Sequence, residues 1–129
     1  MNSDPERRGH YPGRAPIDAY GNGGFRFAGM SHKGSILALP SGIWAWDATP
    51  DHPLILPSLA RLFREPRADF QFLLLGTGLT QIFPSLDIRR AFLEEGLGLD
   101  VMTTGAACRT YNVLLAEGRP VGGAFIATP

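Results

Sequence analysis

The stretch that decides the fold is Val101-Met102-Thr103-Thr104-Gly105-Ala106-Ala107-Cys108-Arg109-Thr110-Tyr111-Asn112-Val113-Leu114-Leu115-Ala116-Glu117. It predicts the end of a buried strand, a Thr-Thr-Gly turn and then a helix, and either threonine hydroxyl can accept a hydrogen bond from the open amides of the first helical turn. At about 100° per residue, Cys108, Arg109 and Asn112 share one polar strip. Most of the remaining helix surface is apolar, which predicts burial on several sides.

The second half of the chain alternates helices and strands. An amphipathic helix is expected over 57–65, ended by Pro66, and a second over 85–95. The strands are expected at the near-continuous apolar run Phe70–Leu75, at Leu99–Met102 and over 121–127. This alternation predicts right-handed crossovers and a mainly parallel central sheet with helices on both faces.

The first half predicts a β meander. Residues 1–16 are polar and rich in Gly and Pro, so we expect a disordered tail followed by one three-layer α/β domain over 17–129. Gly24–Ala28 is expected as an exposed edge strand that pairs with Ser35–Leu39 around a turn at 31–34. Ile43–Asp47 alternates, which places Trp44 and Trp46 on one face. Those two side chains either cover the sheet from inside or form a docking surface, and burial in the core is favoured.

Composition limits the class of protein. The chain has 129 residues, 44% of them hydrophobic, and a formal net charge of zero, so nothing indicates nucleic acid binding. The longest apolar runs are far shorter than the roughly 20 residues that span a bilayer, and the N-terminus lacks a secretory h-region. Cys108 is the single cysteine, which excludes an intrachain disulfide. We therefore expect a soluble cytoplasmic protein without direct membrane insertion.

The candidate site combines two turns that follow strands. If those strands are parallel, Gly76-Thr77-Gly78 and Thr103-Thr104-Gly105 lie at the same edge of the sheet. Backbone amides there, with Arg109 as a cation and Asn112 for orientation, would form a cradle for a small anionic ligand. The competing interpretation is structural: Arg109 pairs with Glu117 or Asp100, and Asn112 satisfies backbone groups.

Catalytic and metal chemistry have little support in the pattern. Cys108 lies near a helix N-terminus, which would favour its thiolate, yet isolated core cysteines usually pack as small apolar groups. His10, His32 and His52 are scattered without ligand spacing. We expect no catalytic residue, no metal and no cofactor, and the balance is against an enzyme.

These residues resemble a known family. Gly76-Thr77-Gly78, Met102 to Leu114 and Glu117-Gly118-Arg119-Pro120-Val121 are similar to the family that includes the mitochondrial respiratory complex I assembly factor 3 proteins and small bacterial and archaeal relatives of unknown function. Tyr20-Gly21, Gly24-Phe25, Gly34-Ser35 and Trp46 also fit, so the resemblance covers about 17–127.

The resemblance implies a three-layer α/β fold with extra β-strands and a role in assembly or interaction at a membrane complex. It brings no catalytic residues. A non-enzymatic binding or assembly module with a protein partner is therefore the first functional hypothesis. The anionic-ligand cradle is the second, and a homodimer formed through the face that carries Trp44 and Trp46 is the third.

Overall fold

A five-stranded mixed sheet lies at the centre of the computed structural model, which describes residues 11–51 and 54–129. The strand order is β5-β4-β8-β6-β7, with bounds Gly42–Trp46, Ser35–Leu39, Val121–Phe125, Phe72–Gly76 and Gly98–Met102 in that order. β6 runs parallel to β8 and to β7, whereas β4 is antiparallel to both β5 and β8.

The expected mainly parallel sheet is therefore not confirmed. The short connection between Leu39 and Gly42 returns the chain on itself, and so short a link can join only antiparallel strands. The β4–β5 hairpin then joins β8 from the other side, which makes half of the sheet antiparallel. The alternation of helices and strands in the second half of the chain accounts only for the parallel part of the sheet, which is formed by β6, β7 and β8.

The N-terminal strands form a second, antiparallel sheet, with β1 (Ala19–Gly21), β2 (Gly24–Phe27) and β3 (Met30–Lys33) in that order. The expected hairpin between residues 24–28 and 35–39 is wrong, because β2 lies between β1 and β3 and is not an edge. The tight turn is at Ala28 and Gly29, whose φ angles are 50° and 75°, as a type I′ turn requires. The stretch expected as a turn, 31–34, is mostly strand.

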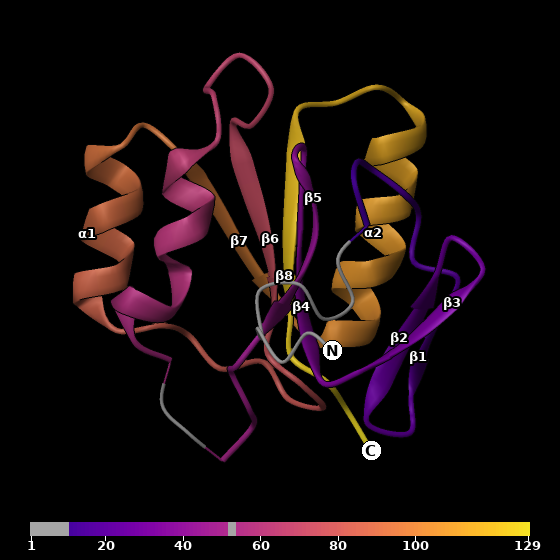
Figure 1. Ribbon diagram of the computed structural model, residues 1–129. Coiled ribbons are helices and arrows are strands. Elements are labelled where there is room, and N and C mark those ends of the chain that lie inside the picture. The colour runs from indigo at the N-terminus through magenta and orange to yellow at the C-terminus, as the bar shows by residue number, and fades with distance from the viewer. Residues whose placement is uncertain (1–10, 52–53) are drawn as a thin grey trace, which may run out of the picture.

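Helices cover both faces of the central sheet (Figure 1). The 3-10 helix η2 (Leu56–Arg64) and α1 (Leu86–Glu94) lie on one face, and α2 (Thr104–Ala116) lies on the other with the small sheet beyond it. Each face has its own apolar core: Leu59, Phe92 and Leu73 belong to the first, and Tyr111, Phe125 and Leu74 to the second. β6 contributes to both, as its apolar run predicted.

Trp44 and Trp46 pack toward η2, on the same side of β5, as their alternation predicted. Trp46 is buried and its indole N–H donates to the carbonyl of Ser58 at 2.9 Å. The Arg61 guanidinium lies 3.7 Å from the centre of the Trp44 ring. The face proposed for a dimer is therefore largely covered by η2.

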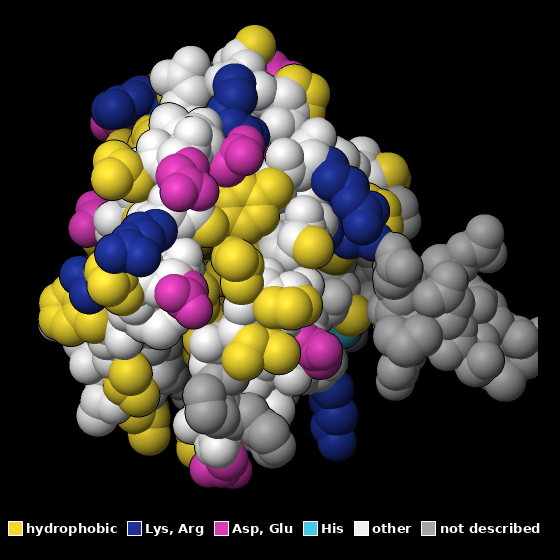
Figure 2. Space-filling view, turned by 90° about the vertical axis from the view of Figure 1, so that its left-hand side faces the viewer, with side chains coloured by type: hydrophobic (Ala, Val, Ile, Leu, Met, Phe, Trp, Pro, Cys, Tyr) yellow, Lys and Arg dark blue, Asp and Glu magenta, His cyan; other side chains and the backbone are white. Residues whose placement is uncertain are grey.

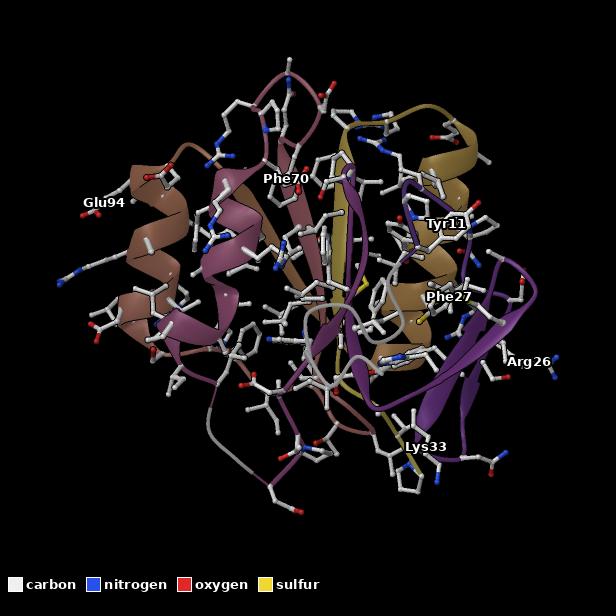
Figure 3. The ribbon with its side chains drawn as sticks, viewed as in Figure 1. Tyr11, Arg26, Phe27, Lys33, Phe70 and Glu94 are labelled. Atoms are coloured by element: carbon white, nitrogen blue, oxygen red, sulfur yellow. The ribbon has the colours of Figure 1, made fainter. Side chains whose placement is uncertain are left out.

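The segment before β1 contacts the domain. Tyr11 exchanges backbone hydrogen bonds with Ile43 on β5, and Ala15 and Ile17 are buried. Figure 3 shows Tyr11 beside α2, and Phe27 between the small sheet and α2. The rest of the expected tail, residues 1–10, lies outside the described residues. Within the described chain, no helix has the length and apolar character needed to cross a membrane.

Candidate functional site

The two turns predicted to form a cradle do meet at the carboxyl ends of β6 and β7, and they bind each other. The Gly78 amide donates to Oγ1 of Thr104 at 2.9 Å, and the Thr104 amide donates back to the Gly78 carbonyl at 2.9 Å. The Thr104 hydroxyl itself donates to the carbonyl of Ile126 at 2.7 Å. Two of the amides that an anion would need, those of Gly78 and Thr104, are thus engaged within the protein.

Glycine at position 76 lets this contact form. A Cβ on Gly76 would lie 2.8 Å from the Cα of Thr104, which is too close for a backbone neighbour to accommodate. Thr104 is fully buried and is not the helix cap. That role belongs to Thr103, whose hydroxyl accepts from the Ala106 amide at 3.4 Å.

The polar strip on α2 splits into three separate environments. Asn112 holds the backbone of Ile17, accepting from its amide and donating to its carbonyl, each at 2.8 Å. Cys108 is buried, and that burial raises the pKa of its thiol to about 12 against the smaller opposing effect of the Arg109 charge. A thiol with this pKa is a poor nucleophile at neutral pH.

Arg109 is exposed and does not pair with either predicted acid. Its Nη1 lies 3.5 Å from the hydroxyl of Tyr20, next to Gly105. Glu117 instead lies 4.0 Å from Arg119. The structure therefore leaves one cation and one phenol at the surface near the start of α2.

The structure draws attention to residues 79–83, which sequence reasoning assigned to no element; we call this segment the apolar loop. Leu79, Ile82 and Phe83 keep 73%, 55% and 68% of their surface exposed. Single exposed apolar side chains are normal, but three on one short loop make this loop a candidate contact surface. The available signal was three large apolar residues in a segment without helix or strand periodicity.

Thr77 holds this loop in shape. Its Oγ1 accepts from the Ile82 amide at 2.9 Å and lies 2.6 Å from the carbonyl of Thr80. Its amide donates to the carbonyl of Met102 at 2.9 Å, which ties the loop to β7. The Gly-Thr-Gly motif thus organises a loop whose apolar side chains face solvent.

A groove of about 420 Å³ runs beside the loop, between α1 and β7. Phe83, Leu93, Leu97, Leu99 and Val101 supply its apolar lining, and Arg89 and Asp100 also reach it. Figure 2 shows hydrophobic side chains spread over this face of the molecule, with charged side chains among them. Glu94 extends from α1 away from the sheet (Figure 3). The described residues hold no group of three or more His, Cys, Asp and Glu placed to bind a metal ion.

Residues 17–126 match the sequence profile of a family described as a protein of unknown function (DUF498/DUF598). The chain belongs to this family. An uncharacterized protein of Rhodobacter capsulatus is 34% identical over 119 residues, which cover 92% of this chain and 90% of that protein. The resemblance to the assembly factor 3 proteins is confirmed as well.

NADH dehydrogenase (ubiquinone) 1 alpha subcomplex assembly factor 3 of Mus musculus is 28% identical over 92% of this chain. The match spans 64% of the mouse protein's length, so a third of that protein has no counterpart here. In both relatives the similarity covers nearly all of this family member's chain.

Solved structures agree with the fold. The crystal structure of an outer membrane protein from Bartonella henselae has a TM-score of 0.88 and 46% identity, covering 93% of this chain and 100% of that one. A protein of Bordetella pertussis described as a Mth938-like domain has a TM-score of 0.71 and 29% identity, covering 98% and 91%. The arrangement of the two sheets with η2, α1 and α2 in the described residues is thus a Mth938-like fold.

Proposed function

We propose that this family member is a non-enzymatic, assembly-factor-like module that binds a protein partner through the apolar loop and the adjoining face of α1. The observation that carries the proposal is the exposure of Leu79, Ile82 and Phe83 on a loop fastened by Thr77. A contact surface that is already ordered loses less conformational entropy on binding, which favours association. The similarity to assembly factor 3 proteins supports the same class of function.

A partner in a respiratory membrane complex would recruit the protein to a membrane without an inserted segment. We place the free protein in the cytoplasm, which is compatible with the free thiol of its single cysteine, Cys108. The mouse relative is named as an assembly factor of the NADH dehydrogenase 1 alpha subcomplex, and this name supports recruitment to a membrane complex.

Capture from a lysate of the source cells tests the proposal. The tagged native chain is compared with Leu79→Ser/Phe83→Ser and with Val113→Ser, which removes a comparably exposed apolar side chain from α2. We expect the native chain and Val113→Ser to enrich the same protein, and the loop variant to lose about tenfold or more of it. Equal recovery by all three chains, or no enrichment over an unrelated bait, would rule the proposal out.

Anionic-ligand binding is the second candidate, and the exposed Arg109 beside Tyr20 is the observation in its favour. The amides of Thr77, Gly78 and Thr104 are already hydrogen-bonded within the protein. A ligand at this place would therefore depend on the two side chains and the remaining first-turn amides of α2. That dependence makes Arg109 the position to test.

A further inference from the structure

We infer that the free edge of β7 accepts an extended segment of the partner protein, in which a Lys or Arg stands between two apolar residues. The inference rests on the proposed function, because it describes how the partner of the apolar loop would continue across the neighbouring groove. Extended segments that add to a sheet edge gain affinity from backbone hydrogen bonds and specificity from alternate side chains.

The two edges of the central sheet differ. At the β5 edge, Tyr11 donates to the Ile43 carbonyl at 3.1 Å and accepts from the Ile43 amide at 2.9 Å, so the chain covers its own edge. β7 is the other edge, and no described strand pairs with its outer side. Natural proteins seldom leave an edge strand open beside apolar surface, because it is a template for pairing.

The outward backbone groups of β7 can be assigned. Gly98 donates to Gln71, and Met102 accepts from Thr77, so the even-numbered residues bond toward β6. Leu99 and Val101 then direct their N–H and C=O groups to the free edge, because bonding direction alternates along a strand. In agreement, the Gln81 side-chain amide donates to the Val101 carbonyl at 2.7 Å. Of the four outward backbone groups, the N–H and C=O of Leu99 and Val101, only the Val101 carbonyl is therefore bonded within the described chain, to the Gln81 side chain.

The side chains of β7 define the partner's sequence pattern. Leu99 and Val101 pack on the α1 face, where Phe83 and Leu93 line the same groove. Residues of an added strand opposite Leu99 and Val101 would point into this apolar groove, since paired residues share a face. Apolar side chains are therefore expected at those two positions of the partner.

Asp100 specifies the residue between them. Asp100 borders the groove along β7, but alternation along the strand directs its side chain to the face opposite Leu99 and Val101. It is exposed, and none of the ion pairs of the described residues involves it. An opposite charge directly across the strands stabilises pairing and a like charge weakens it. A second copy paired antiparallel about Asp100 would set two carboxylates against each other, so the charge favours a foreign segment with Lys or Arg.

Two labelled peptides test the inference on the full chain. One has the central sequence Thr-Val-Lys-Val-Thr, and the other has Glu in place of Lys. By fluorescence anisotropy we expect the native chain to bind the Lys peptide about fivefold more tightly, and Asp100→Lys to reverse the preference. Asp18→Lys, an exposed acid replaced beside the small sheet, should keep the native preference.

Hydrogen exchange measured by NMR locates the binding. The amides of Leu99 and Val101 should become protected when the Lys peptide is added. Equal affinity for the two peptides, no binding of either, or unprotected Leu99 and Val101 amides would overturn the inference. A dimer of the native chain that protects those amides without peptide would overturn it too.

Loss of lysate capture in Leu79→Ser/Phe83→Ser together with unselective peptide binding would leave the proposed function standing and reject strand addition.

Discussion

Gly78 and Thr104 hold each other through reciprocal hydrogen bonds, amide to hydroxyl and amide to carbonyl, each 2.9 Å long. This pair joins the turn after β6 to the first residue of α2. It explains why two small-residue motifs, 26 positions apart, occur together in one sequence. Their shared role is to fasten the carboxyl ends of two strands below the apolar loop.

Replacing Thr104 with Val should destabilise the protein by about 2–4 kcal/mol. The swap keeps the shape but leaves the Gly78 amide and the Ile126 carbonyl without their buried partner. Urea unfolding measures the effect. Thr110→Val, at a half-buried position of the same helix, should change stability by no more than about 0.5 kcal/mol. Similar losses in both variants would contradict the role assigned to the pair.

Two glycines at the site should respond differently to alanine. In Gly76→Ala the new methyl meets the backbone of Thr104 at 2.8 Å, so we expect a loss of about 1–3 kcal/mol. In Gly105→Ala the nearest group is the hydroxyl end of Tyr20, a side chain that is 43% exposed and free to move. Alanine's better helix propensity should offset that movement. Thermal unfolding of the two variants measures the difference. A larger loss of stability in Gly105→Ala than in Gly76→Ala would refute the prediction.

Asn112→Ala should release the segment before β1. It removes both side-chain hydrogen bonds to Ile17, and we expect a loss of about 1–3 kcal/mol. Amide hydrogen exchange at Ile17 should become much faster, whereas exchange at the sheet amide of Leu74 should follow global stability alone. Unchanged protection at Ile17 would show that the segment is held by other contacts.

Stability should fall above pH 9 because of Cys108. Burial raises the pKa of its thiol from 9.0 to about 12, so the unfolded chain ionises first as the pH rises. The contribution of the buried, neutral thiol to the free energy of unfolding is fully present below pH 9. Above pH 9 it is lost at up to about 1.4 kcal/mol per pH unit. Burial likewise raises the pKa of Tyr111 from 10.0 to about 12, which adds a second loss above pH 10.

Cys108→Ala provides the control for this pH dependence. Urea unfolding from pH 7 to 10 should show a flatter profile in the variant between pH 9 and 10. A thiol reagent should modify the native protein far more slowly than the unfolded protein at pH 8, because the native thiolate fraction is very small. Fast modification of the folded chain would contradict the raised pKa.

Anion binding at α2 should depend on Arg109. A panel of phosphates and carboxylates is screened by thermal shift, where a ligand at 100 times its Kd adds about 2.7 kcal/mol of stability. The shift should disappear in Arg109→Ala and persist in Arg26→Ala, an exposed arginine on β2. An equal shift in both variants would place the ligand elsewhere.

Local chemistry made most elements predictable. Pro57, Pro66 and the spacing of Leu59 and Leu62 located the first helix, and the apolar run before Gly76 located β6, which contributes to both cores. The positions of the turns in the first half were less predictable. Ala28 takes a positive φ angle that alanine rarely adopts, so Gly29 alone signalled the turn that creates β3, without the usual Asn or Asp before it.

The candidate site, like the fold, has features that the sequence predicts and features that it does not. The sequence by itself determined that two Gly/Thr turns follow strands and that Cys108 and Asn112 share a helix. The expected burial of that helix on several sides is wrong, because Val113 stays exposed and only Thr104, Ala107, Cys108 and Tyr111 are buried. Only the tertiary structure decided that those turns bind each other, that Asn112 holds Ile17 and that Leu79, Ile82 and Phe83 remain exposed. Periodicity reports which residues need burial, whereas partners and free surfaces depend on contacts between segments far apart in the chain, which no local pattern encodes.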